Sequence, residues 1–250
     1  MNPTACILVI GNEILSGRTQ DANIQFLGRR LGALGIALRE VRIIPDVRET
    51  IISNVVELRA RFDHLLTTGG IGPTHDDITS PCVAEAFGVP WEIHADSFAK
   101  LEAYMAPGSF NAARQRMATL PRGAVPIDNP VSVAPGFSIG NVHVMAGVPR
   151  IMQAMFENLA PLLSGGKPVV SASWHADGLL EGTIAEGLEA IQHRFPTLDI
   201  GSYPYERFDR RGVSLVSKGS DEDAVFEAAK AVRGLIARLG FIPIKGEPAP

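Results

Sequence analysis

The stretch that decides the fold is Thr67-Thr68-Gly69-Gly70-Ile71-Gly72-Pro73-Thr74-His75-Asp76-Asp77-Ile78-Thr79. An apolar run at 62–66 precedes it and predicts a strand, and a helical pattern through residues 80–87 follows it. A glycine-rich turn between a strand and a helix lets the backbone come close to a ligand and turn its N–H groups toward an anion. The simpler interpretation is a turn with solvated acids. The added threonine pair, histidine and aspartate pair favour a phosphate site.

The start of the following helix carries its own signals. Pro81 suits the first helical position, where no N–H is needed, and Ser80 or Thr79 can cap the helix. The adjacent carboxylates at 76 and 77 sit where a divalent cation beside a phosphate would need oxygen ligands. His75 has two interpretations, one as a ligand or general acid and one as a solvent-facing loop histidine.

The composition is that of a globular protein. The chain has 250 residues, of which 46% are hydrophobic and 20% charged, with a net charge of −4. These values predict one large domain or two modest ones, and they imply no general affinity for nucleic acid. No stretch is long enough to span a bilayer and no signal peptide is evident, so we expect a cytoplasmic protein with no membrane partner. Cys6 and Cys82 lack the spacing of a metal site and are expected to be buried free thiols.

Strands and helices alternate in the first ninety residues. Residues 5–10 are continuously apolar, as in a strand buried on both faces, whereas 37–44 alternates apolar and charged residues, as in a strand nearer an edge. Helical patterns follow at 23–34, 48–61 and 80–87. This order predicts an open parallel sheet with helices on both faces. Ligands bind outside the carboxyl ends of such strands, so segments 11–17, 45–46 and 69–77 should converge on one crevice.

The remainder of a first domain, residues 1–165, is less regular, and a second domain at 168–250 has a different pattern. Short strands are predicted at 91–93, 123–127 and 142–145, helices at 95–105, 111–118 and 151–162, and a rigid loop at 129–137. Beyond the flexible stretch 164–168, strands at 169–174, 199–203, 213–217 and 241–244 alternate with helices in the order βαββαβ. That is the ferredoxin-like arrangement of a small α+β domain. His175 and Asp177 are expected to be loop residues rather than a site.

Three motifs in this order are similar to those of a known family. They are Gly11-Asn12-Glu13-Ile14-Leu15-Ser16-Gly17-Arg18-Thr19-Gln20-Asp21, the stretch from Thr68 to Thr79, and Ala134-Pro135-Gly136-Phe137. They closely resemble the molybdopterin-binding (MogA/MoaB-like) domain of competence/damage-inducible protein A, CinA, and the N-terminal domain of eukaryotic FAD synthases. The resemblance covers residues 4–165, and a weaker one around 199–204 continues into the middle domain of these proteins.

The resemblance implies a fold, ligands and roles. The fold is a three-layer α/β/α domain with a mostly parallel sheet, and the ligand is a small-molecule pterin or nucleotide diphosphate. Asp46 and Asp77 fall where molybdopterin adenylyltransferases carry acidic residues implicated in catalysis. CinA-type and FAD-synthase-type members are associated with hydrolysing ADP-ribose or FAD at the pyrophosphate, with a divalent metal (Mg²⁺ or Co²⁺) and K⁺. Relatives commonly associate into dimers or trimers, so we expect a homo-oligomer.

Two departures from the family pattern bear on the site. The family stretch Leu-Pro-Gly-Val-Pro-x-Glu-Met is Met145 to Met152 here, so a proline and the glutamate are lost, and no role for that glutamate carries over. The glycine usual in an Asn-Pro-Val-Gly loop is Ser132, which we expect to reshape the pocket rim. With its last residue at Pro250, the chain is expected to lack the C-terminal amidohydrolase domain of CinA and the FAD-synthesising domain of FAD synthases.

Pyrophosphate cleavage needs neutralised phosphate oxygens and an activated water, which a divalent cation can supply. We expect Asp46 and Asp77 to be catalytic, with Asp46 orienting the water or acting as base, and Asp76 and Asp77 to hold the metal. The N–H groups of three loop glycines and the Thr74 hydroxyl would cradle the diphosphate. The residues predicted to contact a nucleotide or pterin are Asn12, Glu13, Gly69, Gly70, Gly72, Pro73 and Thr74.

Three functions remain open from the sequence. The first is a metal-dependent nucleotide pyrophosphatase acting on FAD, ADP-ribose or a similar compound. The second is a molybdopterin-binding module without hydrolase activity. The third, an adenylyltransferase of molybdenum cofactor biosynthesis, ranks lower, because those enzymes carry a Gly-Gly-Thr-Gly form with arginine before the aspartate. Ile71 and Asp76 occupy those two positions here.

Overall fold

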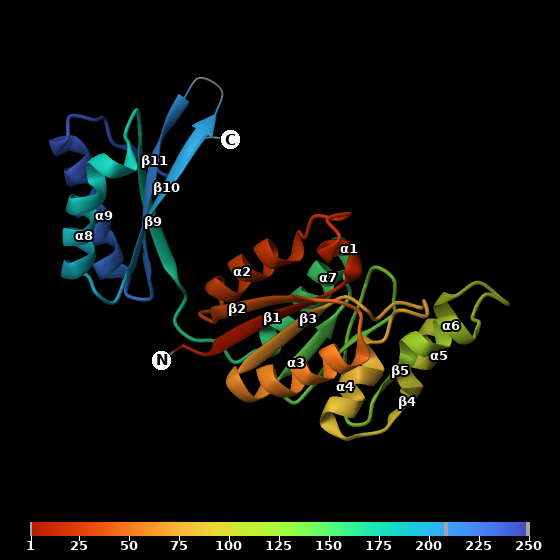
Figure 1. Ribbon diagram of the computed structural model, residues 1–250. Coiled ribbons are helices and arrows are strands. Elements are labelled where there is room, and N and C mark those ends of the chain that lie inside the picture. The colour runs from red at the N-terminus through yellow and green to blue at the C-terminus, as the bar shows by residue number, and fades with distance from the viewer. Residues whose placement is uncertain (1, 208–209, 249–250) are drawn as a thin grey trace. The chain divides into compact units, whose positions relative to one another are not determined.

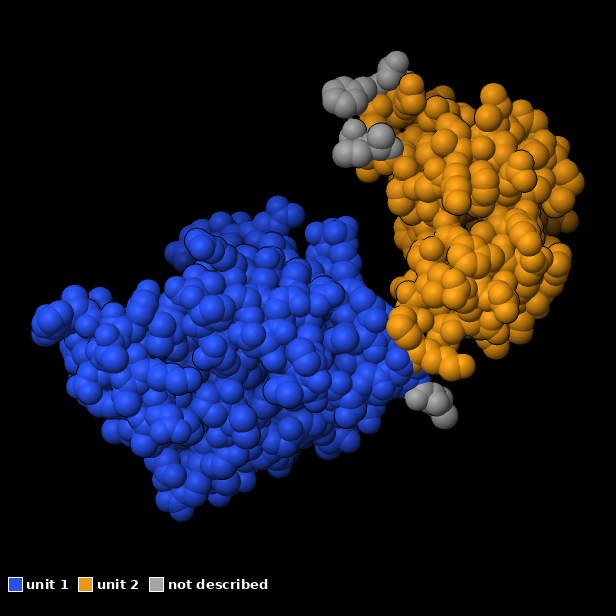
Figure 2. All heavy atoms as spheres, turned by 180° about the vertical axis from the view of Figure 1, so that it is seen from behind, with its two compact units in different colours: residues 1–166 blue, residues 167–250 orange. Residues whose placement is uncertain are grey.

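The computed structural model describes residues 2–207 and 210–248. The chain divides into two compact units, residues 1–166 and 167–250, which Figure 2 colours separately. The stretch 164–168, predicted from the sequence as the domain boundary, spans this division. Each unit has its own hydrophobic clusters, two in the first unit and two in the second.

The first unit is built on a six-stranded sheet with the strand order β2-β1-β3-β8-β7-β6. Strands β2, β1, β3 and β8 run parallel, and β7 runs antiparallel to both of its neighbours, so the sheet is mostly parallel. The predicted position of residues 37–44 at an edge is confirmed. The bounds are β1 Thr4–Ile10, β2 Ala37–Ile44, β3 His64–Thr68, β6 Val125–Ile127, β7 Gly136–Ile139 and β8 Val142–Met145.

Helices cover both faces of this sheet, which explains the continuous apolar run of β1. Cys6, Leu8 and Ile10 point into the cluster formed with α3 and α4, and Ala5, Ile7 and Val9 point into the cluster formed with α2 and α7. Successive side chains of a strand alternate between faces, so both sets must be apolar. Figure 1 shows the three layers. The helices are α2 Asn23–Ala33, α3 Arg48–Arg61, α4 Thr79–Phe87 and α7 Pro149–Leu159.

Smaller elements complete the first unit. An antiparallel pair of strands, β4 and β5, lies with the helices α5, α6 and η1 beside α4 (Figure 1). A single helical turn, α1, follows β1, and η2 follows α7. Their bounds are α1 Asn12–Leu15, β4 Trp91–Ile93, α5 Ala95–Tyr104, α6 Ala112–Gln115, η1 Arg116–Ala118, β5 Thr119–Pro121 and η2 Ala160–Leu162.

Several local predictions for the first unit were wrong. The strand expected at 62–66 is shifted to His64–Thr68, because Phe62 ends α3 and its N–H still bonds to Leu58. The loop expected at 129–137 gives way at Gly136 to strand β7, and β5 was not predicted at all. Helix α4 begins at Thr79, and neither Thr79 nor Ser80 caps it, since their hydroxyls donate to the carbonyls of Gly69 and Thr119.

The second unit is a four-stranded antiparallel sheet in the order β10-β11-β9-β12, with α8 and α9 on one face (Figure 1). This is the strand order of a ferredoxin-like fold, as the βαββαβ pattern predicted. His175 and Asp177 lie in strand β9 rather than in a loop, and the last strand is shorter than expected. The bounds are β9 Val170–Asp177, α8 Glu181–Arg194, β10 Asp199–Arg207, β11 Arg210–Gly219, α9 Glu222–Arg238 and β12 Ile244–Lys245.

Two global expectations can be compared with the structure. Cys6 and Cys82 are buried free cysteines, as predicted, and burial raises the pKa of the Cys6 thiol to about 11. No helix within the described residues has both the length and the apolar character needed to cross a bilayer.

Candidate functional site

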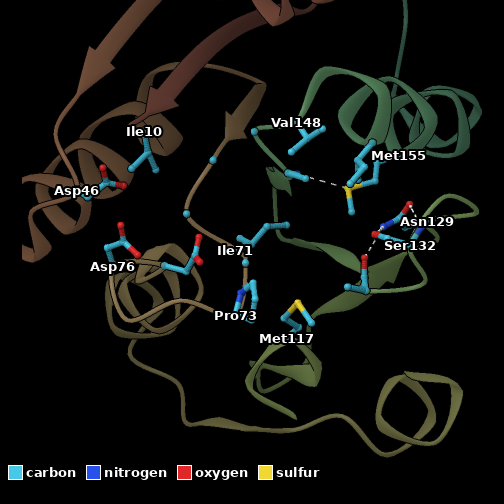
Figure 3. A pocket seen from close by; sticks show the side chains of 18 of the residues that line it. Ile10, Asp46, Ile71, Pro73, Asp76, Met117, Asn129, Ser132, Val148 and Met155 are labelled. Carbon is cyan, nitrogen blue, oxygen red and sulfur yellow. Dashed lines mark hydrogen bonds between the residues drawn. The ribbon is translucent and has the colours of Figure 1, made fainter. Parts of the chain in front are cut away.

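Four neighbouring parallel strands end at the same edge of the first unit's sheet, and the loops that follow them line one cavity of about 500 Å³ (Figure 3). The helical turn α1 after β1 contributes Glu13, the loop after β2 contributes Asp46, and the loop after β3 contributes 69–73, 76 and 77. The predicted convergence of these three segments is therefore observed. The loop after β8, at 146–148, also lines the cavity. A cavity of this size accommodates a small organic ligand.

Hydrogen bonds tie the strand ends to one another. The Gly11 N–H donates to the carbonyl of Ile44 at 3.1 Å, and the Asn12 N–H donates to Asp46 Oδ2 at 2.9 Å. Across the sheet, the Gly69 N–H donates to the carbonyl of Met145 at 3.1 Å. These bonds tie the loop after β1 to the loop after β2, and the loop after β3 to the end of β8.

Gly69 and Gly70 are required by the packing of their own loop. Gly69 has a φ of 104°, and a Cβ there would lie 2.1 Å from the carbonyl oxygen of Ile10. Gly70 has a φ of 67°, and a Cβ there would lie 2.2 Å from Thr79 Oγ1. Only glycine adopts this backbone without strain and leaves room for these close contacts.

The bonding of the loop corrects the expected phosphate cradle. The Gly69 N–H is used by Met145, so it does not face a ligand, whereas no acceptor lies against the N–H of Gly70 or Gly72 within the described residues. The Thr74 hydroxyl is also committed, because it donates to Asp77 Oδ2 at 2.5 Å, and the Thr74 N–H donates to the same oxygen at 2.8 Å. Asp77 thus lines the cavity and also accepts two hydrogen bonds from Thr74 in its own loop.

One end of the cavity is acidic. Four carboxylates line it, those of Glu13, Asp46, Asp76 and Asp77, and no lysine or arginine is among the described lining residues. Burial raises the pKa of the Asp46 carboxyl above its ordinary value, the Asn12 N–H opposes that rise, and the charges of Glu13 and Asp76 add to it. Like charges held together in this way are typical of functional sites rather than of structural ion pairs.

The other predicted polar residues lie outside the lining. The side chain of His75 is 97% exposed and its Nδ1 is 4.0 Å from Asp76 Oδ1, which agrees with a solvent-facing loop histidine. Asn12 supplies its backbone N–H to Asp46, and neither Asn12 nor Thr74 is a lining residue. Within the described ranges, no group of three or more His, Cys, Asp or Glu is arranged to hold a metal ion, so the metal roles of Asp76 and Asp77 stay predictions.

The other end of the cavity is apolar with two polar side chains (Figure 3). Sequence reasoning placed Ser132 at the pocket rim, which agrees with the lining, and missed the other residues. The rule that placed the other loops at the carboxyl ends of strands would have found Val148, which follows β8. No local signal marks the rest, since they come from η1, from the loop before β7 and from α7. They are Met117, Asn129, Ile151 and Met155.

Comparison with known proteins agrees with this architecture. Residues 6–165 match the family described as "Probable molybdopterin binding domain". The chain belongs to this molybdopterin-binding domain family. Residues 176–243, in the second unit, match "FAD synthase, middle domain". Both parts of the resemblance seen in the sequence are therefore confirmed, and the cavity lies wholly in the molybdopterin-binding domain.

Relatives of this molybdopterin-binding domain protein share its length. A protein of Pyrobaculum arsenaticum is 35% identical over an alignment that covers 96% of each chain. A protein of Aeropyrum pernix is 35% identical over 81% of this chain and 80% of its own. The crystal structure of the protein CinA with unknown function from Thermoplasma acidophilum superposes with a TM-score of 0.61 at 31% identity. It covers 64% of this chain and 96% of its own.

Proposed function

We propose that the protein binds a dinucleotide or nucleotide-sugar diphosphate, such as FAD or ADP-ribose, in the cavity of the first unit and hydrolyses its phosphoanhydride with a divalent cation. The observation that carries the proposal is the division of one cavity into an acidic end and an apolar end, with the glycine loop between them (Figure 3). A diphosphate joined to a planar ring has the same division of charged and apolar parts.

The glycine loop supports binding of the diphosphate. The N–H groups of Gly70 and Gly72 have no acceptor within the described part of the chain, and they belong to a loop that the surrounding bonds hold rigid. Free backbone N–H groups on a glycine turn after a strand are suited to phosphate oxygens. We assign these two groups to the substrate diphosphate, in place of the three glycines expected from the sequence.

The acidic end supports a requirement for a cation. Four carboxylates beside a diphosphate would repel it, and the pKa of Asp46 is raised by burial and further by the charges of Glu13 and Asp76. The donors are hard oxygens, which suit Mg²⁺, and Mg²⁺ takes only one or two carboxylates when substrate phosphates supply other ligands. Asp76 and Asp77, the pair predicted from the sequence, would hold it together with oxygens of the substrate phosphates. When bound, such a cation neutralises phosphate charge and lowers the pKa of water.

Asp46 is the candidate base. Its Oδ2 accepts the Asn12 N–H, which fixes the carboxylate and leaves Oδ1 to accept a proton from the attacking water. A pKa raised by burial makes this oxygen a better proton acceptor than an ordinary aspartate. The reaction adds water across the anhydride, so that FAD yields AMP and FMN as one P–O bond forms and another breaks.

A second candidate function is molybdopterin binding without hydrolysis. The family match over residues 6–165 favours it, since the family is described by that ligand. An adenylyltransferase activity ranks third, because Ile71 and Asp76 differ from the residues expected in those enzymes. These functions differ in products, so one set of assays separates them.

The experiment is an AMP-release assay on the full chain with FAD, ADP-ribose and NAD, in Mg²⁺ or Co²⁺ and then in EDTA. We expect metal-dependent AMP release that falls at least about 100-fold in Asp46→Asn, because the amide still accepts the Asn12 N–H but no longer takes a proton. Asp77→Ala is a less informative variant, since it also frees Thr74 and loosens the loop.

Asp177→Asn in the second unit is the matched control and should keep full activity. Wild-type protein that releases no AMP but binds molybdopterin tightly would replace the proposal with the second function. ATP-dependent adenylation of molybdopterin would establish the third. Full hydrolysis by Asp46→Asn would show that this carboxylate is not the base.

A further inference from the structure

The loop before β7 holds its lining residues in fixed positions through Asn129, which is 3% exposed. The Asn129 Nδ2 group donates to Ser132 Oγ at 2.7 Å and to the Ala134 carbonyl at 2.8 Å. Its Oδ1 accepts the N–H groups of Val131 at 3.0 Å and Ser132 at 3.3 Å. Both donors and both lone pairs of this amide are thus used within the loop, so Asn129 has no capacity left for a ligand.

The conformation of the same loop is strained. Val133 has a φ of 67°, and it is the one non-glycine residue with positive φ in the described chain. A β-branched residue adopts this conformation only when its surroundings impose it, and such strain concentrates at binding sites. The side-chain amide of Asn129 forms hydrogen bonds with Ser132 and Ala134, the residues before and after Val133, and these bonds supply that constraint.

Ser132 is left with a free donor at the apolar end of the cavity. Ser132 is a lining residue whose Oγ accepts from Asn129, and no acceptor for its own hydroxyl proton occurs in the described residues. A hydroxyl whose lone pair is engaged still has one O–H to donate. Figure 3 shows Ser132 on the cavity wall, on the same side as Met155.

Ala146 supplies a second donor on that side. Its backbone N–H donates to the thioether Sδ of Met155 at 3.4 Å, and both residues line the cavity (Figure 3). A thioether is a weak acceptor, and a methionine side chain changes conformation readily. The Ala146 N–H can therefore exchange this contact for a stronger acceptor on a ligand.

We propose that Ser132 and Ala146 form a specificity-determining pair of donors for a fused heterocycle that presents a carbonyl oxygen beside an unprotonated ring nitrogen. Oxidised flavins, pterins and guanine present such an acceptor pair, whereas adenine presents an amino donor beside each comparable nitrogen. The apolar side chains around the pair, Met117, Val148, Ile151 and Met155, would contact the faces of the ring. The assignment rests on the proposed function and narrows it, since it seats the flavin rather than the adenine of FAD at this end.

The test measures binding of FMN and AMP by calorimetry in Mg²⁺. Neither ligand contains a phosphoanhydride, so the result does not depend on hydrolysis. We expect the wild type to bind FMN more tightly than AMP. Ser132→Ala should weaken FMN binding about fivefold to tenfold, which corresponds to one neutral hydrogen bond, and leave AMP binding unchanged. Ala146→Pro, which removes the N–H, should act on FMN in the same direction.

The control is Ser53→Ala on α3, whose hydroxyl donates to the Thr50 carbonyl and lies outside the cavity. It should change neither affinity. Equal affinities of the wild type for FMN and AMP would overturn the inference, as would an equal loss for both ligands in Ser132→Ala. A preference for FMN that Ser132→Ala reduces, in a protein that releases no AMP from FAD, would uphold the inference and refute hydrolysis.

Discussion

The polar side chains on the sheet of the second unit and the acids in the cavity of the first unit differ in whether they have hydrogen-bonding or basic partners. In the second unit the polar groups on the sheet face away from the helices are paired with one another. The Tyr205 hydroxyl donates to Asp177 at 2.7 Å, and the Ser214 hydroxyl donates to Glu247 at 2.7 Å. In the first unit, the acids of the cavity face each other without a basic partner among the described lining residues. Paired groups indicate structure, and crowded like charges indicate a site.

Strand direction accounts for the difference. The parallel strands of the first unit all end at one edge, so the loops after β1, β2, β3 and β8 must meet there. The strands of the second unit are antiparallel to their neighbours, so the loops of adjacent strands lie at opposite edges. Parallel strands therefore bring the acids of several loops to one edge of the sheet, whereas antiparallel strands place the loops that follow adjacent strands at opposite edges.

Each unit contains one of the chain's two tryptophans, Trp91 in β4 and Trp174 in β9. The variants Trp174→Phe and Trp91→Phe therefore provide backgrounds in which fluorescence reports the unfolding of one unit at a time. This matters because the free energy of unfolding is defined separately for each unit when a protein has more than one domain. The three predictions below use these backgrounds.

The largest effect is expected for Gly69→Ala, which adds a Cβ inside the glycine loop. The new Cβ would lie 2.1 Å from the Ile10 carbonyl oxygen at a φ of 104°. We expect the free energy of unfolding of the first unit to fall by about 3 kcal/mol or more, measured with urea and Trp91 fluorescence. Gly88→Ala is the control, since its φ is 66° but nothing lies within 4 Å of the added Cβ. It should cost about 1 kcal/mol, the strain of the backbone alone. Equal losses would refute the close packing of the loop.

A second, smaller effect should distinguish the units in acid. Buried His143 has its pKa lowered from 6.5 to about 4 by burial and by the charge of His64. The unfolded chain therefore takes up this proton first, and the stability that the neutral ring contributes is present above pH 6.5 and lost as the pH falls toward 4. We expect a loss of about 2 kcal/mol in the first unit over that range.

The bonding around His143 supports its neutral form. When both rings are neutral, His64 Nε2–H donates to the Ser164 carbonyl, His64 Nδ1 accepts from His143 Nε2–H, and His143 Nδ1 accepts from Ser138. In His143→Gln, the free energy of unfolding of the first unit should decline less steeply between pH 6.5 and 4 than in the wild type. Trp91 fluorescence measures this unfolding. An unchanged slope in the variant would exclude His143 as the titrating group.

The smallest effect should be seen in the second unit at high pH. Burial, the hydrogen bond to Asp177 and that residue's charge raise the pKa of Tyr205 to about 12 from 10.0. The stability contributed by the neutral phenol is present below pH 10 and lost as the pH rises toward 12. Tyr205 is partly exposed, so we expect only about 1 kcal/mol.

Trp174 fluorescence measures this loss in the second unit. Tyr205→Phe should remove the pH-dependent part, and Tyr203→Phe, whose parent side chain is 55% exposed, should leave it in place. A decline at high pH that persists in Tyr205→Phe would assign it to another group.

Much of the fold could be predicted from local patterns. The continuous apolar run at 5–10 and the alternating run at 37–44 gave a central and an edge strand, because side-chain period and burial are linked in a strand. The strand–helix alternation gave a parallel sheet, and the parallel sheet brought Glu13, Asp46 and the 69–77 loop to one edge. The strand β7 was missed because Gly136 lies in a turn-rich stretch, and only pairing with β8 makes it a strand.

By itself, the sequence determined the two-unit α/β architecture, the glycine loop and the meeting of three acidic segments, because each depends on periodicity, turn residues or strand order. Only the tertiary structure decided which groups face the cavity. Gly69 gives its N–H to Met145, Thr74 gives its hydroxyl to Asp77, and Asn129 leaves Ser132 a free proton. These outcomes depend on hydrogen bonds and packing between atoms brought together by the fold, and no local pattern records which partner each donor finds.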